Sequence, residues 1–119
     1  MKVLLINGSP HKKGCTYTAL HEVETTLQQN GIETEMLHLG KAPVSGCIAC
    51  MNCMTTGFCF QKDIVRDIQM RLDEFNGIVI GSPVYYSAPT GQLISFLNRL
   101  FFATEKRMAG KLGASVVSC

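Results

Sequence analysis

The stretch KVLLINGSPHKKGCT, from Lys2 to Thr16, sets an unbroken apolar run directly before a loop of small and polar residues. An apolar run without alternation is typical of a strand that is covered on both faces, as in a parallel sheet. Behind the loop, apolar residues recur at helical spacing from 20 to 27, and Asn30-Gly31 suits a helix C-terminus. The stretch therefore predicts a strand, a loop and a helix, the first unit of a parallel α/β sheet.

The rest of the chain repeats this alternation of strands and helices. Residues 32–39 (IETEMLHL) alternate apolar with polar and predict a second strand nearer the sheet edge, while 77–83 (GIVIGSP) predict a third, buried strand. A fourth strand is expected at 112–119, and Asp63 can cap a helix. The predicted helix faces are Ile64, Val65, Ile68 and Leu72 after Asp63, and Leu93, Phe96, Leu97, Leu100 and Phe101 before the last strand.

The expected architecture is a doubly wound parallel sheet in one domain of residues 1–119. A length of 119 residues suits a single core. Parallel strands are joined by crossover helices, so a fourth strand with no helix after it predicts a C-terminally incomplete chain, with four strands and three helices present. A small four-stranded sheet is the alternative.

Composition and charge narrow the class of protein. A formal net charge of +2 is too small to argue for a nucleic acid or an anionic membrane as partner. The N-terminal apolar run is too short for a signal peptide, and a membrane span needs about 20 apolar residues. We therefore expect a cytoplasmic protein, in which thiols stay reduced and a disulfide framework explains the six cysteines poorly.

The loop after the first strand has the features of an anion site. Glycines permit close backbone approach, two hydroxyls are present, and the loop ends where a helix begins, with its free N–H groups. It matches neither the Walker A pattern nor G-x-G-x-x-G. The alternative is a tight turn with ordinary capping. The candidate phosphate-binding residues are Ser9, His11, Lys13, Gly14, Cys15 and Thr16.

The loop after the third strand, GSPVYYSAPTGQ, offers a surface for a planar ring. Two prolines stiffen it, and two adjacent tyrosines have flat faces with polar tips. The alternative is that one tyrosine packs into the core. With phosphate on the first loop and a ring against the second, the two loops predict a mononucleotide site. The candidate ring-binding residues are Pro83, Val84, Tyr85, Tyr86 and Ser87.

Four cysteines fall within the irregular segment of residues 40–62, in the pattern C-x2-C-x2-C-x5-C. So long a loop inside a compact domain is usually functional. The first three cysteines resemble the bacterial ferredoxin run, which binds an iron–sulfur cubane; structural zinc and redox-labile thiols without a metal are the alternatives. We expect the array to lie at the same sheet edge as the other two loops, and Cys119 to be buried. The candidate metal ligands are Cys47, Cys50, Cys53 and Cys59.

Taken together, GSPHKKGCT, the cysteine array before Asp63 and GSPVYYSAPTGQLISFLNR resemble the flavodoxin-like NAD(P)H-dependent FMN reductases over essentially the whole chain. The iron–sulfur flavoprotein branch is the most similar. The resemblance implies a three-layer α/β/α fold, FMN phosphate on residues 9–16, isoalloxazine against 83–87 and a [4Fe–4S] cluster on the four cysteines. It also implies homodimers or homotetramers. The family commonly has Arg where His11 stands and Asn where Cys15 stands, and neutral His holds phosphate less firmly than Arg.

These patterns predict a redox enzyme in which ferredoxin or NAD(P)H supplies electrons, and FMN passes them to a small-molecule acceptor. Because the flavin performs the chemistry, we name no residue as a proton-transfer catalyst. One alternative is a cluster-free NAD(P)H-dependent FMN or quinone reductase. A flavodoxin-type electron carrier and a zinc-binding interaction module are the others.

Overall fold

The computed structural model covers residues 1–119 and contains one four-stranded, entirely parallel sheet in the order β2-β1-β3-β4. All four predicted strands are confirmed, and β2 lies at an edge as expected. Val3 of β1 is opposite Thr34 of β2 and Gly77 of β3. The strands are β1 (Lys2–Asn7), β2 (Glu33–His38), β3 (Gly77–Pro83) and β4 (Leu112–Ser118).

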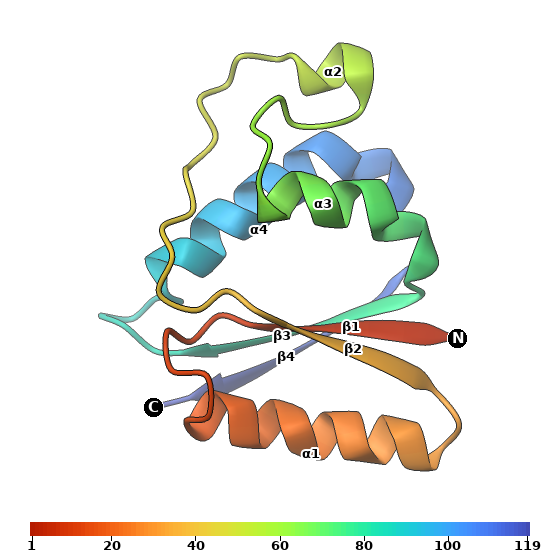
Figure 1. Cartoon of the computed structure of the whole chain (residues 1–119), viewed down its shortest axis with the longest axis vertical. Coiled ribbons are helices and arrows are strands. Elements are labelled where there is room, and N and C mark those ends of the chain that lie inside the picture. Colours follow the sequence, from red (N-terminus) through yellow and green to blue (C-terminus); the bar gives the residue numbers. More distant parts are fainter.

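Helices cover both faces of the sheet, which confirms the three-layer fold. One face is covered by α1, whereas α3 and α4 lie together on the other (Figure 1). The helices are α1 (Cys15–Gln29), α2 (Cys53–Thr56), α3 (Ile64–Arg71) and α4 (Gly91–Thr104), with 3-10 turns at Leu72–Glu74 and Glu105–Met108. No helix is long and apolar enough to cross a membrane.

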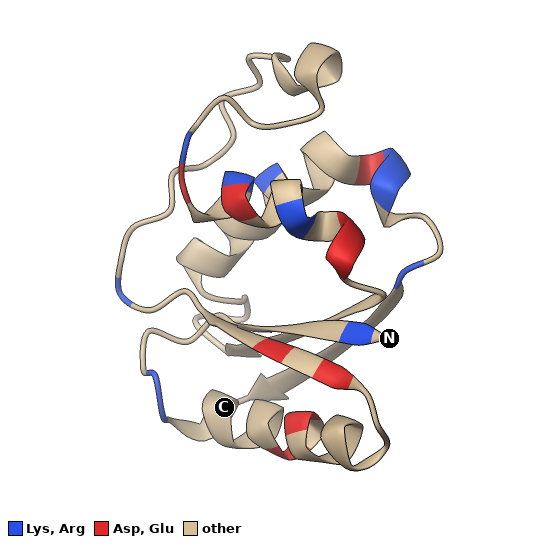
Figure 2. Ribbon diagram, turned by 45° about the vertical axis from the view of Figure 1, so that its right-hand side comes forward, with Lys and Arg blue, Asp and Glu red and all other residues tan.

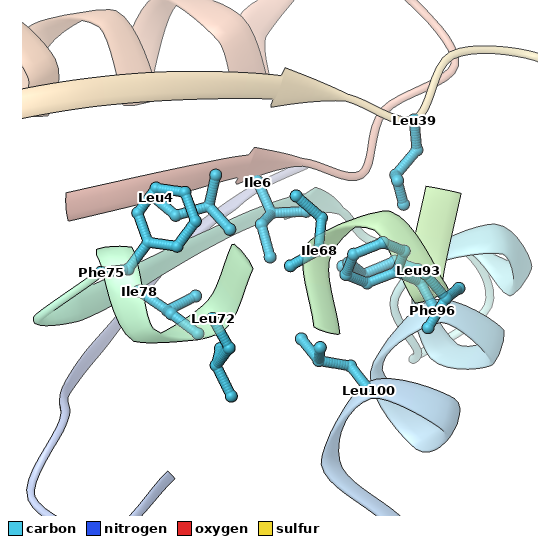
Figure 3. Close-up of a cluster of buried hydrophobic side chains, with 11 residues drawn as sticks. Leu4, Ile6, Leu39, Ile68, Leu72, Phe75, Ile78, Leu93, Phe96 and Leu100 are labelled. Atoms are coloured by element: carbon cyan, nitrogen blue, oxygen red, sulfur yellow. The ribbon is translucent and has the colours of Figure 1, made fainter. Parts of the chain in front are cut away.

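The core is divided by the sheet, because successive side chains of β1 point to opposite faces. Leu4 and Ile6 belong to an eleven-residue cluster with α3 and α4, which is the larger half of the core (Figure 3). Val3 and Leu5 pack with Leu20 of α1 on the other face. Burial of both faces of β1 explains why its sequence shows no polar alternation.

The helix boundaries follow from local signals in the sequence. Asp63 caps α3 as predicted, since its Oδ1 accepts a hydrogen bond from the Val65 N–H at 3.1 Å. After α1, Gly31 has a φ of +76°, a left-handed conformation that favours glycine.

Two burial predictions are wrong. Phe101 is 38% exposed, because eight residues after Leu93 it is rotated about 80° from that buried side chain around the helix. Cys119 is exposed rather than buried, directly after the edge strand β4. A third difference is that the irregular cysteine segment contains the single-turn helix α2.

Candidate functional site

The loop after β1 is shaped by its own polar side chains. Asn7 is fully buried at the end of the strand, and its Oδ1 accepts a hydrogen bond from the Ser9 N–H at 3.0 Å. The Ser9 Oγ in turn accepts from the His11 N–H at 3.1 Å. The loop therefore has a defined course before any ligand is bound.

The N-terminus of α1 is open to an anion. Gly14 occupies the N-cap position, no side chain caps the helix, and the first turn carries no acidic residue. The first amide N–H groups of a helix have no intrahelical partner, and the helix dipole favours negative charge there. The Thr16 side chain is not part of this opening, because it is buried and its Oγ1 is 2.8 Å from Ser118 Oγ of β4.

Basic side chains surround a shallow hollow beside this helix end. The loop after β1 contributes His11, Lys12 and Lys13, and Lys41 comes from the loop after β2. Figure 2 shows basic positions, in blue, on both of these loops. Lys41 escaped the sequence analysis, since it follows a different strand. The strand order would have revealed it, because adjacent parallel strands bring their carboxyl ends to the same edge.

The tyrosine loop is a tight turn that presents both rings to solvent. Tyr85 and Ala88 exchange two backbone hydrogen bonds, of 2.7 and 3.1 Å, around Tyr86 and Ser87. Both central residues have positive φ, 49° and 64°, a rare conformation for residues other than glycine that is often found at functional sites. Tyr86 is fully exposed and Tyr85 about half exposed, so the alternative of a tyrosine packed in the core is wrong.

Buried hydrogen bonds fix the two loops relative to each other. The hydroxyl of Thr90, at the N-cap of α4, donates to the Gly8 carbonyl at 2.6 Å. The Gly8 N–H donates to the Gly81 carbonyl at 2.8 Å, and the Thr90 N–H donates to Ser82 Oγ at 3.2 Å. The loop after β1 and the tyrosine loop after β3 thus form one rigid carboxyl edge of the sheet.

The cysteine array does not lie at that edge, so its predicted position is wrong. The segment leaves β2 at the carboxyl edge but then crosses the outer side of α3 and α4, away from the sheet (Figure 1). There the four cysteines line one pocket with Arg99, Phe102 and Ala103, in the C-terminal half of α4. The loop is long enough to reach either place, which is why the sequence did not decide between them.

The four thiols share a pocket without meeting at one point. All six cysteines are free, and no group of three or more His, Cys, Asp or Glu side chains is arranged to hold a metal ion. Partial burial raises the pKa of Cys53; a backbone hydrogen bond opposes this shift, and the proximity of Cys50, Cys59 and Cys47 adds smaller upward contributions. The four cysteines are therefore not tied up in disulfides, and the site is not preformed around a single ion.

Arg99 is a residue of this site that the sequence analysis missed. Its side chain is 1% exposed, and its two terminal nitrogens bind the Asp63 carboxylate at 2.6 and 2.8 Å. Its Nε donates to the Cys59 sulfur at 3.4 Å. A guanidinium fork on a carboxylate is a strong and geometrically specific interaction.

The ion pair shifts the pKa values of its two members in opposite directions, each toward the charged form. Burial alone would raise the pKa of Asp63, but the hydrogen bonds and charge of Arg99 hold it below its usual value. For Arg99, burial alone would lower the pKa, and Asp63 with a smaller contribution from Cys59 raises it instead. Both groups are therefore charged near neutral pH.

His38 lies at the end of β2, next to the first loop. Its Nδ1 is 3.2 Å from Asn7 Nδ2, which can only donate, so Nδ1 accepts and the neutral ring carries its proton on Nε2. Burial lowers the pKa of His38, Lys12 lowers it further, and Glu24 opposes both. The sequence analysis gave this histidine no role. In the structure it is a neutral hydrogen-bond acceptor that holds the side chain of the buried Asn7 in place.

Comparison with known proteins agrees with this arrangement. The family model described as NADPH-dependent FMN reductase matches residues 1–119. An iron–sulfur flavoprotein of Archaeoglobus fulgidus is 30% identical over 118 residues, covering 98% of this chain and 54% of the relative. An iron–sulfur flavoprotein of Methanocaldococcus jannaschii is 36% identical over 99 residues, covering 83% and 51%. The chain thus spans little more than half the length of these curated relatives.

Solved structures show the same fold at lower identity. The apo form of an NADH:FMN oxidoreductase superimposes with a TM-score of 0.65 at 19% identity, covering 99% of this chain and 59% of the other. A flavone reductase gives a TM-score of 0.66 at 17% identity, covering 98% and 43%. With a family model matched from the first residue to the last, the chain belongs to the NADPH-dependent FMN reductase family.

Proposed function

We propose that residues 1–119 are a single FMN-binding domain of a flavin-dependent oxidoreductase in which electrons pass between a [4Fe–4S] cluster and FMN. One observation carries the proposal: a chain of this family gathers four free cysteines around one pocket. The names of the similar iron–sulfur flavoproteins support it. Because the chain covers about half of those relatives, activity and partners are part of the proposal.

The carboxyl edge fits FMN. A phosphate group matches the uncapped N-terminus of α1 and the basic hollow next to it. A flavin ring matches the exposed tyrosine turn, where aromatic faces and backbone groups are accessible. We assign the phosphate to Ser9, His11, Lys13, Gly14, Cys15 and Thr16, the last through its backbone N–H and not its buried side chain. We assign the ring to Pro83, Val84, Tyr85, Tyr86 and Ser87.

The cysteine pocket fits a cluster better than a single ion. A cubane is bound through four different irons, so its cysteine sulfurs lie farther apart than four ligands around one zinc. Four free thiols on one pocket with no compact three-residue group match the wider arrangement. Most of the lining side chains are apolar, and an apolar shell limits the access of water to a metal centre. We assign the cluster to Cys47, Cys50, Cys53 and Cys59.

The two sites of one chain lie at opposite ends of α4. Thr90 lies at the carboxyl edge of the sheet, to which we assign the flavin, whereas Phe102 lines the cysteine pocket. Twelve residues of helix separate the two along the α4 axis by about 18 Å. Electron transfer slows steeply with distance, so the flavin of another subunit is the better partner for this pocket. Exposed apolar side chains around it suit a homodimer or homotetramer contact: Ile48, Met51, Met54, Phe60 and Phe102.

When bound, the cluster supplies one-electron transfer, and FMN couples two such transfers to a two-electron acceptor. We propose ferredoxin or NAD(P)H as electron donor and a small molecule as acceptor. A cluster-free NAD(P)H-dependent FMN or quinone reductase is the second candidate. The family model, described as NADPH-dependent FMN reductase and matching residues 1–119, favours that candidate.

Anaerobic reconstitution tests the proposal. The purified chain is incubated with FMN, iron and sulfide under reducing conditions, and its absorbance spectrum, iron and sulfide contents are measured. We expect bound FMN and about four irons per chain. C53S should lose iron and keep FMN, whereas C119S, outside the array, should keep both.

The outcomes separate the two candidates. FMN with no iron in the wild-type chain rejects the cluster and leaves the cluster-free reductase. Failure to bind FMN rejects the proposed function. Equal iron contents in C53S and C119S would remove the cysteine array from the metal site.

A further inference from the structure

Arg99 is the only charged residue that is buried in this chain. The Arg99 side chain lies on a side of α4 that does not face the apolar core between the sheet and the helices. It is buried because the cysteine segment covers it from the outer side of the helix. A buried charge is costly unless it is paired and fully hydrogen-bonded. The partners of Arg99 therefore indicate what the residue stabilises.

The guanidinium binds both ends of the cysteine segment. Besides Asp63, Nη1 donates to the Ser45 carbonyl at 3.1 Å and Nη2 to the Gln61 carbonyl at 3.4 Å. Ser45 stands two residues before Cys47, and Gln61 two residues after Cys59. One side chain thus closes the loop that carries the four cysteines.

Cys59 is held more firmly than the other three cysteines. Its sulfur accepts from Arg99 Nε, and its N–H donates to Gln69 Oε1 at 2.8 Å. Gln69 is fully buried, and its Nε2 donates to the Arg99 carbonyl at 3.0 Å. Among the other cysteine sulfurs, only Cys47 accepts a hydrogen bond, and that donor is the nearby Ala49 N–H of the same loop.

We propose that Arg99 is the positioning residue of the cysteine site: it fixes the Cys59 sulfur as the anchoring ligand and raises the reduction potential of the centre bound there. This inference rests on the proposed function. Hydrogen bonds to ligand sulfurs and local charge set the potentials of iron–sulfur clusters. An N–H donor and a positive charge both stabilise the added electron, so their loss disfavours reduction.

Three variants separate the hydrogen bond from the charge. R99K keeps the charge but lacks the planar fork that reaches both loop ends and the sulfur, and R99M removes charge and donors. R71M is the matched control, because Arg71 also forms a two-pronged ion pair, with Glu35 at 2.8 and 2.6 Å, but does not touch the cysteine segment.

The first readout is the midpoint potential of reconstituted protein, from anaerobic redox titration followed by electron paramagnetic resonance. We expect R99K to lower the equilibrium constant for reduction of the cluster at least tenfold, which is a fall of about 59 mV in midpoint potential for one electron. The fall should be larger in R99M, and R71M should keep the wild-type potential. Wild-type potentials in R99K and R99M overturn the inference while the proposed function stands.

The second readout needs no cluster. In metal-free protein we expect amide hydrogen exchange over residues 45–61 to be at least tenfold faster in R99K than in the wild type, and unchanged in R71M. Equal exchange in R99K and wild type overturns the positioning role. A wild-type chain that binds no iron overturns the proposed function and the potential effect, and faster exchange in R99K then still supports the positioning role.

Discussion

Neutralising Asp63 in the variant D63N is expected to lower the free energy of unfolding by about 3 kcal/mol, at the low end of the range for breaking a buried ion pair. Asn keeps the oxygen that caps α3, so the change tests the charge and not the cap. It puts an NH₂ group where the second oxygen accepts from Arg99 at 2.6 Å. Arg99 is 1% exposed and cannot lose its proton, so its charge is left buried without a counterion.

Removing the other partner should cost less. In R99M the charge left behind is Asp63, which is 32% exposed and can be solvated. We expect a loss of about 1–2 kcal/mol, the scale of hydrogen bonds to a charged group that water partly replaces. The double variant D63N/R99M contains neither charge and should resemble R99M, which gives a coupling energy of about 3 kcal/mol, the whole of the D63N loss.

Urea denaturation of the four proteins, followed by circular dichroism at pH 7 with reductant, completes this cycle. Single-variant losses that add to within about 0.5 kcal/mol in the double variant would refute the buried-pair reasoning. So would a larger loss in R99M than in D63N. Acid gives a further check: the folded pKa of Asp63 is lowered, so the unfolded state takes up its proton first. Stability from the pair is complete above the ordinary value of 3.8 and lost as pH falls through the folded pKa, and D63N should lack this part of the acid loss.

Three further predictions concern the sheet and its carboxyl edge. A Cβ at Gly81 would lie 2.7 Å from a Leu20 methyl, so G81A should lower the free energy of unfolding by about 1–3 kcal/mol in urea denaturation. Gly113 has open space around it, so G113A should leave this free energy unchanged, and equal effects of the two variants would contradict the crowding. T90V leaves buried partners of the Thr90 hydroxyl unsatisfied and should cost about 1–3 kcal/mol, while T90S keeps the hydroxyl and should cost less than T90V. The pKa of His38 is lowered in the folded state, so the unfolded state takes up a proton first, and the free energy of unfolding should fall as the pH drops from 6.5 through the folded pKa. In urea denaturation between pH 5 and 8, H38Q should remove this part of the pH dependence. An unchanged pH dependence in H38Q would refute the assignment.

The strands and helices could be predicted because each is specified locally. The unbroken apolar run of β1 requires cover on both faces, and the structure supplies α1 on one side and α3 with α4 on the other. Asp63 satisfies free N–H groups at the start of α3, whatever the rest of the chain does. Burial and capping act over a few residues, so a single sequence contains enough information to place them.

The partners of the site residues could not be predicted in the same way. Arg99 lies six residues after Leu93, about 120° around α4 from that buried side chain, where a charge normally faces water. It is buried only because a loop some 40 residues earlier folds over it. Lys41 joins the basic hollow through strand order, and the cysteines settle on α4 rather than at the sheet edge. Each of these depends on tertiary packing.

The two candidate sites are stabilised in different ways, and this difference has a functional consequence. The carboxyl edge of the sheet is cross-linked by buried residues such as Thr90, which caps α4 and donates a hydrogen bond to the Gly8 carbonyl. In contrast, no residue from 40 to 62 is buried, so the cysteine segment has no core of its own. Its order depends on a few contacts, chiefly those of Arg99 and Gln69, and such segments open at low free energy. A metal centre that joined the four thiols would add the missing cross-links, so loading of the centre and ordering of the segment should be one coupled event.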